Sequence, residues 1–342
     1  MKMVNVLLSN IKVTDYIIIV ILLFSTTILG YSINSISAIQ SANAVIPGQQ
    51  PTPADTHALS PTIPKSTLIK IKEPTKSLTK STDKFGVKEI YPTKTNGREW
   101  YINMDDPQAD KTLIIDNYTL VKENDGSWRI GSTEGATDSR EFNGRYHIII
   151  GVNTPPGQEP WKNVEITGYA KVVATSSESN YLQWYARGAN HTSEAPCEGT
   201  ALKGRIRVDG EVAWVKEIWH DGGYTQNNAT SEATHDPLIG RWIGWKVVIY
   251  NINNDTAVKM KSYLDNKNNN HWRKVTEFTD RGGWYSDSPD NVFYSAGCGY
   301  PKDYIITGSG PIASFRSDGI VWDFKNLSVR EIESPVNTKK PN

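Results

Sequence analysis

Residues 203–224 carry cationic, aromatic and imidazole side chains at a spacing of two, which places them on one face of a β-strand. The turn dipeptide Asp209-Gly210 divides this segment into the two strands of a tight hairpin. We therefore expect one sheet face to carry Lys203, Arg205, Arg207, Val212, Trp214, Lys216, Ile218 and His220. Glu217 falls in the other row of the second strand, beside Val215 and Trp219, and is expected to face the core.

A second segment repeats the pattern. Gln183, Tyr185 and Arg187 are also two residues apart, and Trp184 and Ala186 point to the opposite face. If this strand neighbours the hairpin, the two rows line one cleft. Such a cleft suits an acidic sugar polymer, because aromatic rings stack on sugar faces and cations bind carboxylates. A merely solvated sheet face is the alternative interpretation.

The same side chains include the groups that β-elimination of a uronate requires: a cation or amide at the carboxylate, a base and an acid. The candidates for the carboxylate are Gln183, Arg187, Arg205 and Lys216, with Lys203 as a further binding residue. His220 or His191 is the candidate base, and Tyr185 or Tyr224 is a candidate base or acid. Hydrolysis by paired carboxylates is disfavoured by the expected inward direction of Glu217.

Short segments rich in β-branched and aromatic residues recur between residues 96 and 333, separated by Asp, Gly and Asn turns. No amphipathic helix of ten or more residues interrupts them. This spacing predicts an all-β domain, an antiparallel sandwich or barrel, followed by a flexible tail over residues 334–342. The 342-residue chain has no net charge, so nothing indicates nucleic acid as a partner.

The N-terminal quarter has a different composition. Lys2 and Lys12 precede an apolar run over residues 16–29, and small residues lead to Ala42-Asn43-Ala44. This order predicts a signal peptide over residues 1–44 or an uncleaved membrane anchor, and hence a secreted or cell-surface protein. Seven of the eighteen prolines lie in residues 45–95, which we expect to form a disordered Pro/Thr/Lys-rich linker.

Two stretches of the C-terminal half match a pattern known from other sandwiches. Residues 242–251 and 258–265 look like paired strands in which a tryptophan and branched residues lead to an aspartate, and residues 315–332 look like a closing strand. Together with the cationic hairpin, they resemble the concanavalin A-like jelly rolls, a superfamily of legume lectins, laminin-G-like modules, glucanases and polysaccharide lyases. The resemblance covers residues 96–333 and implies a jelly roll, but it does not decide the chemistry.

Within that superfamily, jelly-roll alginate lyases carry R-(S/T)-E-L-R, Q-(I/V)-H and Y-F-K-x-G-x-Y strands. Residues 139–142 resemble the first only in part, and Gln183 lacks the histidine two residues on. Nothing matches the third strand, and the E-x-D-x-x-E pair of laminarinase-type glucanases is absent. The resemblance therefore supplies no complete catalytic set, and whether the chain is an enzyme stays open.

Metal and covalent features are sparse. The resemblance implies a calcium ion near the terminal strands, for which Asp318 and Asp323 are candidate ligands, although ordinary turn aspartates are the alternative. No histidine has a zinc spacing. Cys197 and Cys298 are the only cysteines and, in an exported protein, predict a disulfide; free buried thiols are the alternative. N-x-S/T sequons, typical of an exported glycoprotein, begin at Asn117, Asn190, Asn228, Asn254 and Asn326.

Three functional hypotheses follow from these patterns. The first is an exported jelly roll that binds polysaccharide, in particular an anionic one, without chemistry. The second is a polysaccharide lyase that uses Tyr185 or His220 as base, with Arg187 or Arg205 at the carboxylate. The third is a structural or adhesive protein of the cell envelope, which the Pro-rich linker alone favours.

Overall fold

The structure, a computed structural model, describes residues 81–115, 120–131, 147–333 and 335. The predicted signal or anchor, residues 45–80 of the predicted linker and the partial lyase motif at 139–142 lie outside these ranges, as do Asn117 and most of the predicted tail. No helix in the described ranges is both long enough and apolar enough to span a membrane.

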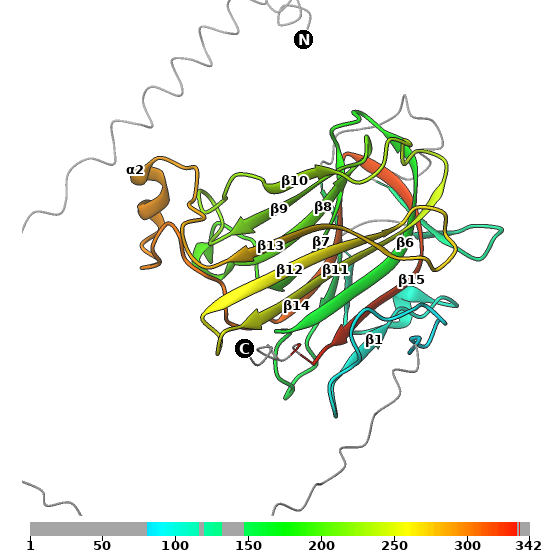
Figure 1. Ribbon diagram of the computed structural model, residues 1–342, viewed down its shortest axis with the longest axis horizontal. Helices are drawn as coiled ribbons and strands as arrows, with labels where there is room; N and C mark the ends of the chain where they lie inside the picture. Colours follow the sequence, from blue (N-terminus) through cyan, green and yellow to red (C-terminus); the bar gives the residue numbers. More distant parts are fainter. Residues whose placement is uncertain (1–80, 116–119, 132–146, 334, 336–342) are drawn as a thin grey trace, which may run out of the picture. The chain divides into compact units, whose positions relative to one another are not determined.

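Two antiparallel sheets form a sandwich, which confirms the predicted fold class (Figure 1). The eight-stranded sheet runs in spatial order β13 (Arg273–Asp280), β12 (Ala257–Asp265), β11 (Trp242–Ile252), β6 (Val164–Thr175), β15 (Ile320–Glu331), β4 (Trp128–Ile130) and β3 (Leu120–Lys122), with β1 (Glu99–Tyr101) also paired to β15. The seven-stranded sheet runs β10 (Asn228–Glu232), β9 (Glu211–Glu217), β8 (Ala201–Arg207), β7 (Tyr181–Gly188), β14 (Ile312–Asp318), β5 (His147–Asn153) and β2 (Leu113–Ile115).

Helical elements in the described part of the chain are single turns. They are η1 (Pro107–Ala109), η3 (Pro196–Glu198), α2 (Asp290–Phe293) and η4 (Tyr294–Ala296). The last three lie in the loops around residues 189–200 and 287–300, at one end of the seven-stranded sheet.

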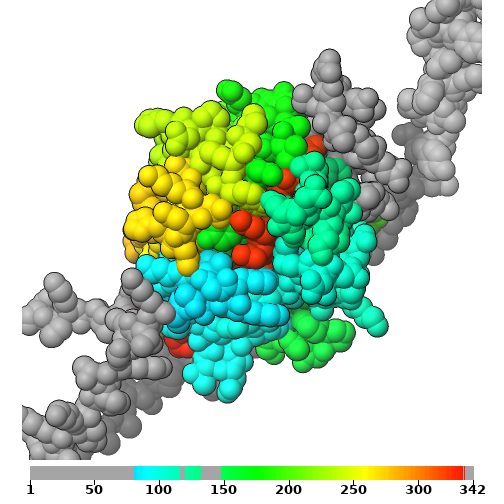
Figure 2. All heavy atoms as spheres, turned by 90° about the vertical axis from the view of Figure 1, so that its right-hand side faces the viewer, coloured from blue at the N-terminus to red at the C-terminus, as the bar shows by residue number. Residues whose placement is uncertain are grey.

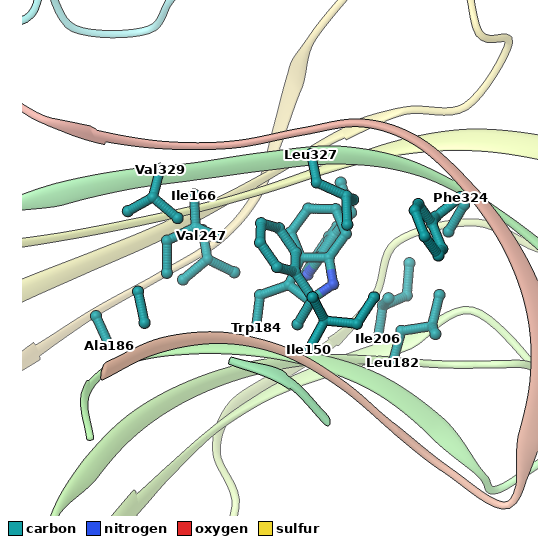
Figure 3. Packing of buried hydrophobic residues seen from close by; sticks show 14 of the residues in the cluster. Ile150, Ile166, Leu182, Trp184, Ala186, Ile206, Val247, Phe324, Leu327 and Val329 are labelled. Atoms are coloured by element: carbon teal, nitrogen blue, oxygen red, sulfur yellow. The ribbon is translucent and has the colours of Figure 1, made fainter. Parts of the chain in front are cut away.

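The core lies between the sheets and is built from the inward-facing row of each strand. Trp184 of β7 points from the seven-stranded sheet toward Leu327 and Val247 of the other sheet (Figure 3). The six most deeply buried tryptophans are Trp161, Trp184, Trp214, Trp219, Trp245 and Trp322. Burial of each large apolar side chain stabilises the fold by about 1.5–3 kcal/mol. Much of the tryptophan excess is therefore packing rather than ligand surface.

Residues 81–95, which the composition assigns to the linker, instead pack on the outer face of the eight-stranded sheet. Val87 is buried there, and Thr93 forms a bridge with Ile332. The carboxylate of Glu165, a buried side chain on β6, accepts the backbone N–H groups of residues 90 and 91, each at 3.1 Å to Oε2. The folded domain therefore includes these residues. Backbone hydrogen bonds to the buried Glu165 carboxylate hold them. Such bonds do not require apolar residues at a regular spacing, so the sequence gives no sign of them.

Candidate functional site

The pairing of β8 and β9 decides which side chains share the outer face of the seven-stranded sheet, the face turned away from the sandwich core. Ile206 pairs with Val212, and Ala201 pairs with Glu217. Directly paired residues project to the same side, so Glu217 shares the outer face with Lys203, whereas Lys216 points into the core. The alternation predicted for the second strand was therefore wrong by one residue. The connection between Ile206 and Val212 reverses which residues of that strand face outward.

Glu217 is the centre of the outer-face cluster and its side chain is fully buried. Its Oε2 contacts Lys203 Nζ and lies 2.9 Å from Nε2 of His191. Its Oε1 lies 3.2 Å from Nδ1 of His220. Burial alone would raise the pKa of Glu217, but the charge of Lys203 and the hydrogen bond from His191 lower it to about 2. Glu217 is thus an ionised carboxylate that holds a lysine and two imidazoles together.

Two tyrosines enclose the ammonium group of that lysine. Lys203 Nζ lies 5.5 Å from the ring centroid of Tyr185 and 4.9 Å from that of Tyr224. The Tyr185 ring is also 6.0 Å from the ring of His191. Burial raises the pKa of both phenols, so both stay protonated at neutral pH. Tyr185 is buried, whereas Tyr224 is partly exposed at the rim of the cluster.

Arg205 is held differently from every other cation of this face. Its Nη2 and Nε donate to Oε1 of Gln183 at 3.0 and 3.2 Å, and its Nη1 donates to Oδ1 of Asn227 at 3.3 Å. The guanidinium lies 4.0 Å from the ring centroid of Tyr181. No carboxylate of the described residues forms an ion pair with it. Arg205 is therefore a partly exposed charge held in place by neutral groups.

The neighbouring arginines show the contrast. Arg207 binds Asp209 and Glu211 at 2.5 and 2.6 Å. Arg316 of β14 is paired with Asp318 at 2.7 Å. Arg316 and Arg205 stand on either side of Gln183 in register, so one amide lies between two guanidinium groups. We call Tyr181, Gln183, Tyr185, Lys203, Arg205, Glu217, Tyr224, His191, His220 and Arg316 the outer-face site.

Two predicted residues lie outside this site. Lys216 is buried between the sheets, where Nζ donates to Asp280 Oδ2 at 3.0 Å and to the carbonyl oxygen of Tyr304 at 2.7 Å. Arg187 has a positive φ of 62° beside a bulge in β7, which takes it out of the row of Gln183. Its guanidinium donates to backbone carbonyl groups, among them that of Lys162 at 3.0 Å. Both cations hold the fold and are not available to a carboxylate ligand.

The two proposed calcium ligands are committed to cations and lie on different sheets. Asp318 binds Arg316 of its own strand through both oxygens, at 2.7 and 3.0 Å. Asp323 is fully buried and contacts Arg129 at 2.7 Å and Lys171 at 2.8 Å. Over the described ranges no three His, Cys, Asp or Glu side chains form a group that could hold a metal. Both aspartates are therefore already paired with cations, and a calcium ion at them stays a prediction.

The predicted disulfide is confirmed between Cys197 and Cys298. The first cysteine lies in η3, and the carbonyl of its neighbour Pro196 accepts the backbone N–H of His220 at 3.0 Å. Gly199 lies so close that a Cβ atom there would be 2.7 Å from that same nitrogen. The cross-linked loop therefore packs directly against one of the two imidazoles on Glu217.

Sequence reasoning missed Glu217 as a site residue, and it missed Tyr181, Asn227 and Arg316. A signal for the last was present, since Ser314, Arg316 and Asp318 alternate along β14 as polar residues do on a solvated strand. The sequence did not indicate which strands lie beside this one. β14 pairs with both β7 and β5, although more than 120 residues separate it from β7 in the chain.

Comparison of the sequence with known proteins identifies no relative. No family model matches the sequence, and no curated protein matches it. A Bacillus subtilis protein of unknown function with a galectin-like fold is 8% identical, with a TM-score of 0.41, covering 72% of this chain and 100% of that one. Arcelin-5, a lectin-like defence protein from Phaseolus vulgaris, is 6% identical, with a TM-score of 0.38, covering 70% and 100%.

The potassium-bound form of the Emp46p carbohydrate recognition domain is 10% identical, with a TM-score of 0.38, and the match covers 67% of this chain and 93% of that domain. All three similarities have identities of 10% or below and TM-scores below 0.5. At such identities and TM-scores they say nothing about which residues act or on what.

Proposed function

We propose that this chain binds an acidic polysaccharide at the outer-face site. The observation that carries the proposal is Arg205, a guanidinium fixed by Gln183, Asn227 and the Tyr181 ring and lacking a carboxylate partner among the described residues. A fixed guanidinium binds a carboxylate through two parallel hydrogen bonds, and little side-chain entropy is lost because the group is already held. The uronate carboxylate of a sugar polymer meets this requirement.

The rim of the site supplies the rest of a sugar contact. Tyr181 and Tyr224 are partly exposed and Asn227 is exposed. The Tyr181 ring and the Asn227 amide contact the guanidinium, and the Tyr224 ring lies at Lys203. Aromatic rings stack on the apolar faces of sugars, and amides bind hydroxyl groups. Export, which the sequence predicts from residues 1–44, would bring this surface into contact with envelope or extracellular polymers.

Arg205→Gln is expected to weaken binding to a uronate polymer roughly 10- to 100-fold, the range for loss of a charge-assisted hydrogen bond of about 1.5–3 kcal/mol. Affinity electrophoresis of the purified chain in gels containing the polymer measures this. Arg207→Gln is the matched control, because Arg207 lies on the same strand but is neutralised by Asp209 and Glu211. Equal losses in the two variants, or none in Arg205→Gln, would overturn the assignment of the site.

A lyase reaction is the second candidate, favoured by one observation: the Tyr185 and His191 rings lie 6.0 Å apart and the His191 and His220 rings 5.9 Å apart. Tyr185 projects to the same side of its strand as Gln183, which pairs with Arg205. In such a reaction His220 would take the C5 proton while Arg205 and Gln183 stabilise the carboxylate. The C4–O bond would then break, and Tyr185 would donate a proton to the leaving oxygen. Binding ranks first because Tyr185 and Glu217 are buried beneath the rim.

Incubation with uronate polymers tests the lyase candidate through the ultraviolet absorbance of the unsaturated product. For a lyase, the absorbance rises with the unaltered chain and the rate falls by at least about 100-fold in Tyr185→Phe, as expected for loss of a general acid. Tyr285→Phe, at an exposed tyrosine outside the site, is the control. Retention without absorbance leaves a binding protein. Failure to bind any acidic or neutral polymer would favour the adhesive envelope role.

A further inference from the structure

The outer face of the eight-stranded sheet is hollowed beside the N-terminal segment. Figure 2 shows the hollow: green and red segments of the chain, the regions of β6 and β15, form its floor. Blue to turquoise segments near the N-terminus and yellow to orange segments form its rim. Register places Tyr169 and Lys171 of β6, Lys325 of β15 and Trp242 of β11 on this face, as paired neighbours.

Aromatic rings line this face, and a glycine makes room for them. The rings of Tyr169 and Trp272 lie 5.7 Å apart. Between them is Gly244, where a Cβ atom would lie 2.5 Å from the Trp272 ring and 2.8 Å from the Tyr169 ring. Trp242, two residues earlier on the same strand, is partly exposed. The absence of a side chain at position 244 thus allows an aromatic platform to form on the sheet.

Lys325 is the cation of this platform that forms no ion pair with a described residue, and Asp125 is the carboxylate whose charge acts on it. Its Nζ lies 4.4 Å from the ring centroid of Trp242 and 5.6 Å from that of Tyr169. Within the described part of the protein it forms no hydrogen bond or ion pair, so all three of its donors are open to a ligand. Lys171 differs, because Asp323 binds it at 2.8 Å and also binds Arg129.

We infer that this hollow is a second glycan site, which takes an acidic sugar residue with its carboxylate on Lys325 and its ring against Trp242. The ligand class rests on the proposed function, since a polymer that pairs with Arg205 also carries a carboxylate that can pair with Lys325. A single unpaired ammonium beside aromatic rings suits a monoanionic sugar better than a phosphate, which would call for several free cations. Sites on both sheets would let one chain hold two polymer strands and gain avidity.

Isothermal titration of the full chain with a short uronate oligosaccharide tests the inference. Two binding sites per chain are expected, and either Arg205→Gln or Lys325→Gln alone reduces the number to one. The double variant binds none. Lys111→Gln, at an exposed lysine in the turn before β2 of the other sheet, is the matched control and keeps two sites.

The possible failures can be told apart. One site in the unaltered chain, lost in Arg205→Gln but kept in Lys325→Gln, overturns the second site and leaves the proposed function intact. One site lost only in Lys325→Gln overturns the role of the outer-face site instead. No binding by the unaltered chain overturns both. Far-ultraviolet circular dichroism of each variant shows that the fold is retained, so that loss of a site reports on the ligand contact.

Discussion

Glu217→Gln is expected to lower the free energy of unfolding by about 3–5 kcal/mol, the range measured when one partner of a buried ion pair is removed. The variant leaves Lys203, which is 1% exposed, as a buried ammonium without a counter-ion. It also replaces one of the two oxygens that contact His191 and His220 by an NH2 group. The side-chain volume is unchanged, so the loss reports on charge and not on packing. Urea denaturation followed by tryptophan fluorescence measures it.

The double variant Glu217→Gln with Lys203→Met is the control, because it removes both charges. Its loss is expected to be smaller than that of Glu217→Gln alone, which a double-mutant cycle expresses as a favourable coupling energy. Acid provides a second check. The pKa of Glu217 is lowered from 4.5 to about 2, so its contribution is complete above pH 4.5 and disappears as the pH falls toward 2. That decline, about 3 kcal/mol, should be absent from the double variant; an equal decline in both proteins would contradict the role of Glu217.

The sandwich could be predicted from the sequence because its causes are local. Alternation of apolar and polar residues marks each strand, and Asp, Gly and Asn turns separate the strands, so the class follows without knowledge of which strands pair. The pairing of Cys197 with Cys298 follows in the same way, since there are no other cysteines. These features required no information about contacts distant in the sequence.

The site could be predicted only in part. It depends on which residues of each strand face outward, and on which strands pair although they are distant in the sequence. The length of the connection between β8 and β9 exchanges Lys216 and Glu217 between the two faces. A bulge at the end of β7 redirects Arg187. Neither feature changes the composition of its strand. A sequence pattern therefore identified the rows of polar residues correctly but assigned one row to the wrong face.

The site also includes loop residues, whose positions cannot be inferred from the alternation of side chains along a strand. His191 belongs to the loop after β7, and Tyr224 bridges to Glu217 from beyond the end of β9. Each reaches the carboxylate because a loop folds back over the sheet edge. The sequence suggested both residues from their side-chain types, and it contained no signal that they meet at one carboxylate.

The second large effect is expected from the disulfide. Replacing Cys197 and Cys298 together by serine should lower the free energy of unfolding by about 5 kcal/mol, because the bridge closes a loop between residues 101 apart and limits the unfolded chain. Thermal unfolding of the variant, beside the unaltered protein with and without reductant, measures this. Reduction should reproduce the variant and leave the variant itself unaffected.

The same replacement should also weaken the outer-face site while the protein is still folded. The cross-linked loop supplies the carbonyl of Pro196 that accepts the backbone N–H of His220, and the same loop carries His191. Once the bridge is gone, these contacts alone must hold both imidazoles on Glu217. We therefore expect weaker retention on a uronate polymer at a temperature well below the unfolding transition, with unchanged circular dichroism. Unchanged retention would mean that Glu217 holds the imidazoles without the cross-link.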